Sequence, residues 1–262
     1  MDILQICIIC GQNSLYIDWI KTAIKNNISY TNFVKQLLLS DGDYFSNPAV
    51  GYYERDLGMP LDNVVFTMKS FIGTDITCAQ CHDSAFEEWT QKQFYQMAAA
   101  FSQVEISGRK NPAAAETIKK IKQEIEATPP KDDKEKQAQR QLLNQVNQFV
   151  SATLANVSIN SKKQLKYPFD YKYKDANPND IVEPKVLTGS TEIYNTEDTR
   201  TEAVTWLTSP QHPTFTKNIV NRYWKHVFGK AIVSNVNNIH GNDKNTESLM
   251  LLLENIFQKL NY

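Results

Sequence analysis

Neither sign of charge dominates this chain of 262 residues. Its 28 Lys and Arg face 29 Asp and Glu, which gives a formal net charge of −1. This balance excludes the electrostatic footprint that nucleic acid or an anionic membrane surface would require. No apolar run approaches the roughly 18 residues of a membrane-spanning helix. We therefore expect no nucleic-acid partner and no membrane span within the chain.

Familiar catalytic motifs are also missing. The sequence contains no Gly-x-Ser-x-Gly elbow, no glycine-rich phosphate loop and no His-Glu-x-x-His zinc motif. Asp83, Glu87 and Glu88 cluster in the sequence, but neighbouring carboxylates alone are not a glycosidase pair. The sequence therefore does not identify an enzyme.

Both ends of the chain predict an internal fragment of a longer protein. The start is apolar but carries Asp2 where a signal peptide needs positive charge, and no small-residue cleavage site follows. The end, residues 258–262, follows an apolar helical pattern without a capping glycine. We expect no export signal in the sequence as written.

The strongest positive signal is Cys78-Ala79-Gln80-Cys81-His82. This is the spacing that attaches a c-type haem. Two thiols on one turn can each add to a vinyl group of the macrocycle, and the imidazole that follows is held against the iron as the proximal ligand. Cys78, Cys81 and His82 are therefore the predicted cofactor-binding residues, with His82 as the iron ligand.

The cysteine pair also has other interpretations. It could be a redox dithiol, although its flanks look helical and such pairs occur near βαβ patterns. It could be half of a zinc site with Cys7 and Cys10, but 67 residues separate Cys10 from Cys78, whereas zinc ribbons use roughly 15–20. It could also be a purely structural pair of small hydrophobes.

Methionines flank the motif and are candidates for a sixth iron ligand. Met97 is the stronger candidate and Met68 the weaker. A Met/His ligand pair would raise the redox potential of the haem. Each also lies on an apolar helical face, where methionine usually serves packing.

The other histidines have simpler interpretations. His212 is expected to initiate a helix, His226 to face solvent and His240 to lie in a turn. Arg222 could pair with a haem propionate or with a carboxylate at a domain interface.

Hydrophobic periodicity predicts a mainly α fold: an irregular multi-helix domain with the haem-type turn, a helical hairpin and a second, partial helical domain. Thr31 is the expected N-cap of the second helix, Thr90 and Gln93 form a capping-box pattern, and Pro213 is a favoured first helical position. A short strand is expected at 186–187. The predicted helices cover residues 15–24, 31–38, 61–71, 90–101, 116–126, 132–155, 199–207, 213–228 and 249–260.

Composition divides the chain into four parts. Residues 1–110 carry the motif, and 111–160, rich in Lys, Glu and Gln, form a helical hairpin or spacer. Residues 161–196 are irregular and proline-spaced, as in an extended linker packed by its aromatics. Residues 197–262 are again helical. The apolar stripe of the helix at 213–228 is predicted as Phe215, Ile219, Tyr223, Trp224 and Val227, and its polar face as Lys217, Asn218, Asn221, Arg222, Lys225 and His226.

Several longer motifs resemble a known family. They are Phe71-Ile72-Gly73-Thr74-Asp75-Ile76-Thr77 with the Cys-x-x-Cys-His run, Trp89-Thr90-Gln91, Tyr167-Pro168-Phe169-Asp170-Tyr171, Trp206-Leu207-Thr208-Ser209-Pro210 and Asn221-Arg222-Tyr223-Trp224. Together they resemble the planctomycete-type cytochrome-c-like family of exported bacterial proteins, which pair two uncharacterised domains.

The resemblance implies that residues 1–110 are the C-terminal part of a first domain and residues 197–262 the N-terminal part of a second. It also implies a covalent haem c, electron transfer with an unknown redox partner, and a periplasmic or otherwise exported location. The same resemblance implies association with exported degradative proteins. The alternatives to a haem-binding electron-transfer protein are a haem-free interaction module and a part of a polysaccharide-degrading system. Ser84 stands where relatives often have a second histidine, so no ligand role is carried over to that position.

Overall fold

The computed structural model describes residues 15–55, 59–85, 89–107, 112–153, 155–186, 198–240 and 247–260. The fold is mainly helical, as predicted. The chain divides into two compact units assembled from segments distant in sequence. The first comprises Met1–Asn26, Ser40–Leu57 and Glu105–Ser158, and the second Asn27–Leu39, Gly58–Val104 and Ile159–Tyr262. The predicted features at Cys7, Cys10, Glu87, Glu88 and Leu187 lie outside the described residues.

In the described part of the first unit, a helix covers residues 15–25, close to the predicted 15–24. Short elements follow: β1 (Gly42–Asp43), η1 (Pro48–Val50) and α3 (Gly51–Glu54). A small sheet has the strand order β1-β3-β2, with β2 at Val104–Ile106 and β3 at Asn156–Ile159. β1 and β3 run antiparallel, and Gly42 lies opposite Val157. Tyr44, Val50 and Val157 are buried core residues of this unit.

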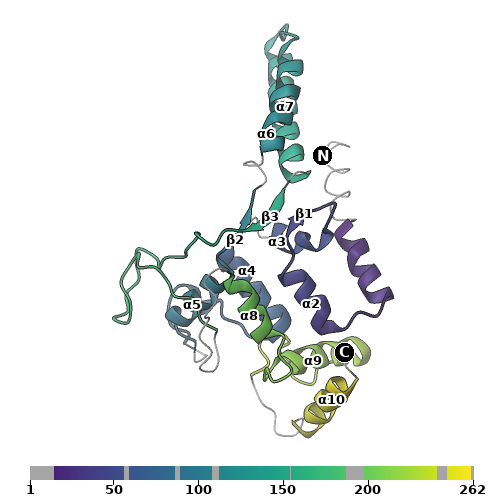
Figure 1. Ribbon diagram of the computed structural model, residues 1–262, viewed down its shortest axis with the longest axis vertical. Helices are drawn as coiled ribbons and strands as arrows, with labels where there is room; N and C mark the ends of the chain where they lie inside the picture. The colour runs from purple at the N-terminus through teal and green to yellow at the C-terminus, as the bar shows by residue number, and fades with distance from the viewer. Residues whose placement is uncertain are drawn as a thin grey trace. The chain divides into compact units, whose positions relative to one another are not determined.

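Two long helices of the first unit, α6 (Pro112–Glu126) and α7 (Asp133–Thr153), form the predicted hairpin. Figure 1 shows them side by side. Gln139 of α7 donates from Nε2 to the carbonyl oxygens of Ile125 (2.7 Å) and Thr128 (3.2 Å), which fixes the turn between the helices. Two contacting helices therefore lie where two Lys-, Glu- and Gln-rich stretches with a break between them predict a hairpin.

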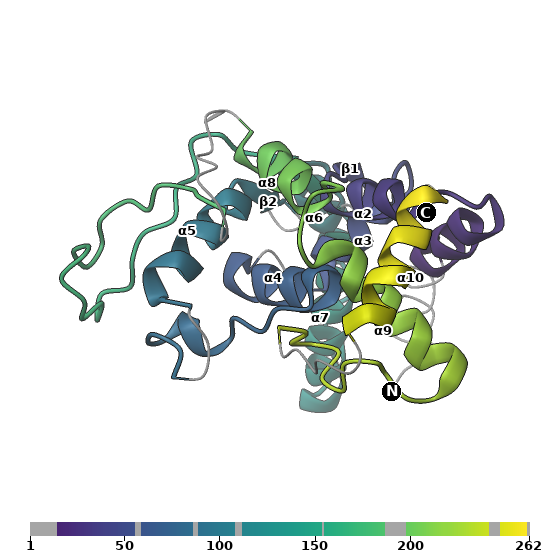
Figure 2. The same ribbon diagram turned by 90° about the horizontal axis from the view of Figure 1, so that it is seen from below.

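The second unit is built around α5 (Gln91–Phe101). α4 (Pro60–Thr67), the 3₁₀ turn η3 (Cys78–Gln80) and α8 (Thr199–Leu207) pack against α5, and α2 (Tyr30–Leu38) packs against α8. α9 (Phe215–Phe228) contacts α10 (Glu247–Lys259) and the π-turn η2 (Met68–Ile72), and Figure 2 shows α9 and α10 side by side. The largest fully buried side chains of this unit are Phe94, Phe101, Phe215, Leu38, Met68, Ile76, Met97, Leu207, Ile239 and Val34.

Local capping decides where these helices begin. Thr90 accepts from the amide of Gln93 and the Gln93 side chain returns to the Thr90 amide, so the predicted capping box is confirmed. α2 begins earlier than predicted, because Ser29 rather than Thr31 is the N-cap. α9 begins at Phe215 rather than at Pro213, because the amide of Thr214 donates to Nδ1 of His212 (3.3 Å) in a turn before the helix.

The stretch from 161 to 186 contains neither helix nor extended strand. Its strand-like pairings are isolated bridges: Lys166 pairs antiparallel with Ile181, and Lys185 is a further bridge residue. The sequence predicts a strand at 186–187, but Val186, which is buried, lies outside any strand, directly after the bridge residue Lys185. A buried β-branched side chain such as Val186 is typical of a strand in sequence, but burial alone does not require one.

Candidate functional site

The Cys78–His82 motif forms a tight turn on the surface of α5. The amides of Cys81 and His82 both donate to the carbonyl oxygen of Cys78, at 3.2 and 3.3 Å. With three residues per turn, positions i and i+3 lie on the same side of a 3₁₀ helix, so Cys78 and Cys81 share one side. Both are exposed free thiols, whereas Ala79 between them is fully buried. Ala79 thus anchors the turn and the thiols face outward.

The chain enters this turn through a braced loop. Asp75 accepts from the amide (3.0 Å) and hydroxyl (2.6 Å) of Thr77, and its other oxygen lies 3.1 Å from Nζ of Lys69. Burial by itself would raise the pKa of Asp75, but the hydrogen bonds from Thr77 and the charge of Lys69 outweigh it and lower that pKa. The carboxylate is therefore held in its charged form, and the approach to Cys78 is fixed.

The ring of His82 is exposed and has one defined hydrogen bond. Its Nδ1 lies 2.7 Å from the carbonyl oxygen of Asp83. A carbonyl oxygen can only accept, so Nδ1 carries the proton and donates. In the neutral ring Nε2 then keeps its lone pair, which is the form of histidine that binds a metal.

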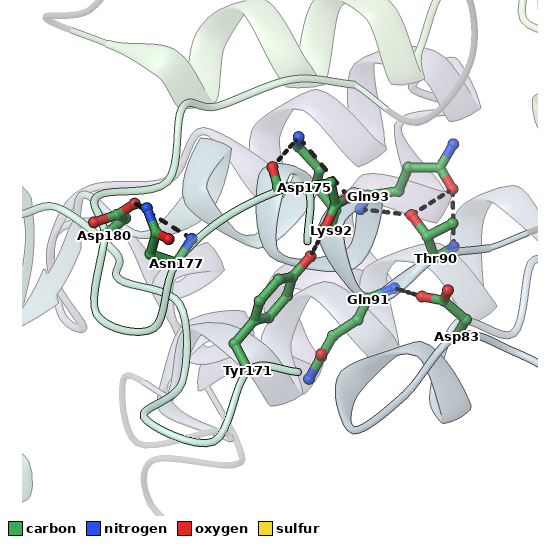
Figure 3. A network of polar contacts seen from close by, with 9 residues as sticks. All are labelled: Asp83, Thr90, Gln91, Lys92, Gln93, Tyr171, Asp175, Asn177 and Asp180. Atoms are coloured by element: carbon green, nitrogen blue, oxygen red, sulfur yellow. Dashed lines mark hydrogen bonds and ion pairs between the residues drawn. The ribbon is translucent and has the colours of Figure 1, made fainter. Parts of the chain in front are cut away.

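Asp83 is held from three sides, and Figure 3 shows part of this network. Its amide donates to the hydroxyl oxygen of Tyr173 (2.7 Å), and its Oδ1 accepts from the amide of Gln91 at the start of α5 (2.8 Å). The amide of the next residue, Ser84, donates to the carbonyl oxygen of Trp89 (2.8 Å). The backbone after the motif is therefore tied to α5 and to the 161–186 segment.

The segment around Tyr171 runs along α5 beside the motif (Figure 3). Tyr171 donates to Oδ1 of Asp175 (2.7 Å), and Nζ of Lys92 donates to the Asp175 carbonyl oxygen (2.7 Å). The Tyr171 ring packs on Tyr167 (4.8 Å between centroids), which packs on Tyr95 of α5 (5.9 Å). Burial, followed by the hydrogen bond to Asp175, raises the pKa of Tyr171, so its phenol stays protonated. Sequence reasoning saw this aromatic density but missed its position beside the motif, because the hydrogen bond from Asp83 to Tyr173 spans 90 positions.

The two candidate methionine ligands lie in the core. Met97 of α5 is fully buried and Met68 of η2 nearly so. Both therefore contribute packing, as their apolar helical faces predicted.

α9 differs from its predicted faces. Asn218 and Asn221, assigned to the polar face, are fully buried, whereas Tyr223 and Val227, assigned to the apolar stripe, are mostly exposed. The amide of Asn221 makes paired bonds with the backbone of Val233, at 2.9 and 2.8 Å. An amide whose donor and acceptor are both satisfied can be buried at little cost.

Arg222 does not pair with a carboxylate in the described structure. It donates to the carbonyl oxygens of Lys69 (2.8 Å) and Val236 (3.0 Å) and to the side-chain oxygens of Asn218 and Asn237. Asn218 in turn donates to the carbonyl oxygen of Ser70 (2.7 Å). These bonds tie α9 to η2, which leads into the motif, so Arg222 orders the backbone instead of meeting a carboxylate.

The remaining histidines fall in three environments. His226 is exposed, as predicted. His240 is more than a turn residue: its Nε2 lies 2.7 Å from Oγ1 of Thr74, and its ring packs edge-on to Trp89. His212 is buried against Trp206, with a 4.5 Å centroid distance, and burial together with the charge of His240 lowers its pKa to about 4.

The described residues offer no further metal ligands beside the motif. No three His, Cys, Asp or Glu side chains in that part of the chain gather as a metal-binding group. Cys78 and Cys81 therefore have no further zinc ligands among these residues. Within the same ranges, every helix is too short or too polar to cross a membrane.

Comparison with protein families finds two matches. Residues 10–106 match PSCyt2, described as a protein of unknown function (DUF1549), and residues 199–262 match PSD1, described as a protein of unknown function (DUF1553). The first match includes the Cys78–His82 turn, and the second begins with α8. No curated protein and no solved structure matches the chain. The chain is therefore similar, over two separate parts, to two families of unknown function whose names denote planctomycete cytochrome-c-like proteins.

Proposed function

We propose that this chain binds a covalent c-type haem at Cys78, Cys81 and His82 and serves electron transfer. The observation that carries the proposal is the turn itself. Two free, exposed thiols share one side of a 3₁₀ turn, and the next residue is a histidine whose Nδ1–H is already bonded to a carbonyl. This donor set suits thioether attachment and ligation through Nε2.

Each residue has a separate role in the proposal. The thiols of Cys78 and Cys81 would each hold the haem by adding across one vinyl group, the sulfur to one carbon and the hydrogen to the other. His82 would supply the iron-ligating nitrogen Nε2, and the carbonyl oxygen of Asp83 holds the ring in the required tautomer. When bound, the haem would supply one-electron chemistry. Met97 stays our candidate for the sixth ligand, because it lies on α5, against which η3 packs.

The proposed setting rests on the similarity to these two families. The two family names denote cytochrome-c-like proteins, which supports an exported bacterial system with a separate redox partner and associated degradative proteins. The exposed thiols favour this function over a purely structural cysteine pair, because structural cysteines are typically buried. One alternative, a haem-free interaction module, predicts no covalent mass gain. The other alternative is a part of a polysaccharide-degrading system.

The test is intact mass after expression with a signal peptide and the cytochrome maturation machinery. We expect the mass of one haem on the wild-type chain, at most a single attachment in Cys78→Ala or Cys81→Ala, and altered iron ligation in His82→Ala. The chain contains its own control: Cys7 and Cys10 have the same spacing without a following histidine, so Cys7→Ala with Cys10→Ala should retain the full haem mass.

An unchanged wild-type mass and no Soret absorption would overturn the haem assignment. Equal loss of haem from the Cys7/Cys10 variant and from the Cys78 variant would also contradict the assignment to this turn. The sixth ligand is tested separately, because Met97→Leu preserves volume and should alter the spectrum of the reduced protein only if the sulfur binds iron.

A further inference from the structure

We infer that Tyr173 is a positioning residue for His82, acting through Asp83. Tyr173 lies in the 161–186 segment, 90 positions from Asp83, yet its hydroxyl oxygen accepts from the Asp83 amide at 2.7 Å. The carbonyl oxygen of Asp83 in turn accepts from Nδ1 of His82 at 2.7 Å. A residue outside the motif thus reaches its imidazole in two hydrogen bonds.

The argument depends on how the backbone of Asp83 is held. The peptide before it is fixed by Tyr173, and the peptide after it by the bond from Ser84 N to Trp89 O (2.8 Å). The side chain of Asp83 is fixed by the amide of Gln91 (2.8 Å). With these three points held, the direction of the Asp83 carbonyl is set, and with it the orientation of the imidazole.

Among these three anchors only Tyr173 lies far from the motif in sequence. Trp89 and Gln91 lie within ten positions of His82, so they are part of the same local loop. The neighbourhood of Tyr173 is itself fixed: its ring packs on Tyr171 (5.7 Å), and Lys92 of α5 holds Asp175. The 161–186 segment therefore acts as a brace on the motif.

The chemical consequence concerns the ligand nitrogen. A histidine whose Nδ1–H donates to a fixed carbonyl presents Nε2 in one tautomer and is a more basic ligand. Without the brace, the exposed ring of His82 is free to rotate and to populate the other tautomer. The iron-ligand role of His82 rests on the proposed function, but the hydrogen-bond chain does not.

The first test uses the protein without haem. Tyr173→Phe removes one oxygen and keeps the ring, and ¹⁵N-histidine NMR is recorded at a pH where the imidazoles are neutral, with His82→Gln to assign the signal. We expect the Asp83 amide to exchange about five- to tenfold faster in Tyr173→Phe, as for the loss of one hydrogen bond. We also expect His82 to change from the Nδ1–H tautomer to a mixture.

Tyr171→Phe is the matched control. It removes a hydroxyl from the same segment, but that hydroxyl bonds Asp175 and not the motif. We expect wild-type tautomer and wild-type Asp83 exchange in this variant. An equal change in both variants would show only general loosening of the segment and would overturn the inference, as would faster Asp83 exchange with an unchanged tautomer.

The second test uses the haem-loaded protein. A weaker Nδ1 hydrogen bond makes the ligand less basic, so Tyr173→Phe should shift the reduction potential upward while Tyr171→Phe does not. If the wild-type chain takes up no haem, the proposed function fails while the NMR result still decides the role of Tyr173. If haem attaches and Tyr173→Phe changes neither tautomer nor potential, the positioning role fails alone.

Discussion

Gly73 lies where α9 approaches the backbone that leads into the Cys78–His82 turn. Its φ is +63°, and a Cβ there would come within 2.8 Å of Asn218 Oδ1 and 2.9 Å of Ile239 Cγ1. Asn218 cannot easily retreat, because Ser70 and Arg222 hold its amide. Gly73→Ala should therefore combine left-handed strain with overpacking and lower the free energy of unfolding by about 2–4 kcal/mol.

Gly229 is the matched control for this substitution. Its φ is +74°, but nothing lies within 4 Å of the Cβ position. Gly229→Ala should lower the free energy of unfolding by only about 1 kcal/mol, from strain alone. Both values come from urea denaturation, and equal losses in the two variants would refute the argument from close packing.

His212 predicts a pH dependence of stability. Burial, with the charge of His240, lowers its pKa to about 4 from the usual 6.5. Above pH 6.5 the residue is neutral in both the folded and the unfolded chain, so it adds no pH dependence there. As the pH falls from 6.5 towards 4, the unfolded chain binds the proton and the folded chain does not, which costs up to about 3 kcal/mol.

The variant His212→Phe keeps a ring against Trp206 and removes the titrating group. Its free energy of unfolding should fall less steeply than that of the wild type between pH 6.5 and pH 4. Its value above pH 6.5 measures the packing change separately. Identical slopes for the two proteins would contradict the buried-histidine account.

Local features of the chain could be predicted residue by residue. The Cys-x-x-Cys-His spacing and the Thr90–Gln93 capping box each depend on residues within a few positions of one another, so the sequence displays them directly. The burial of His212 could not be predicted, because it depends on Trp206 and on the turn before α9. His240 was missed for the same reason, since its partner Thr74 lies 166 positions away.

Among the helices, α9 shows what periodicity does not reveal. Its sequence contains an apolar stripe and a polar stripe. Hydrophobicity predicts that the apolar stripe is buried, but along part of the helix residues of the polar stripe are buried instead. The buried stripe includes Asn218 and Asn221 because their amides bond backbone groups of η2 and of the loop after α9. Tyr223 is mostly exposed, although its ring touches Phe257 of α10 (6.2 Å). A hydrophobicity scale cannot recognise an asparagine whose hydrogen bonds are complete.

Asn221→Ala should reveal the weight of these bonds. The substitution removes two hydrogen bonds to Val233 and leaves its backbone groups without their partner, so the free energy of unfolding should fall by about 2–4 kcal/mol. Asn255→Ala is the control, because that exposed side chain bonds only within α10 and should cost within about 0.5 kcal/mol. A loss at Asn221 as small as that at Asn255 would contradict the proposed anchoring of α9.

In the whole molecule, the helix content and the hairpin were predictable, but the contacts that build the second unit were not. The bonds from Arg222 to Lys69 and from Asp83 to Tyr173 join positions 153 and 90 apart. The predicted boundaries place these partners in different parts of the chain, yet each pair lies in one compact unit. Long-range hydrogen bonds between polar side chains produce no periodic pattern in a single sequence, so they cannot be predicted from it.

The hairpin of α6 and α7 is expected to be dispensable for the motif. It belongs to the first unit, whereas the Cys78–His82 turn belongs to the second, and most of its residues are exposed. Ile118 and Val146 line the same hollow between the two helices, so a short glycine-rich turn can join these positions after removal of residues 119–145. Val150 and Ser151, which are buried, remain.

In this shortened chain, the haem mass after maturation should equal that of the full chain. The unfolding midpoint followed by the second unit's tryptophans should also be retained, because loop length changes stability only slowly. A second variant keeps the length of the full chain but replaces residues 119–145 with a flexible linker of 27 residues. It separates the effect of losing the helices from the effect of shortening the chain. Failure of haem attachment in both variants, with attachment intact in the full chain, would show that the hairpin takes part in forming the site.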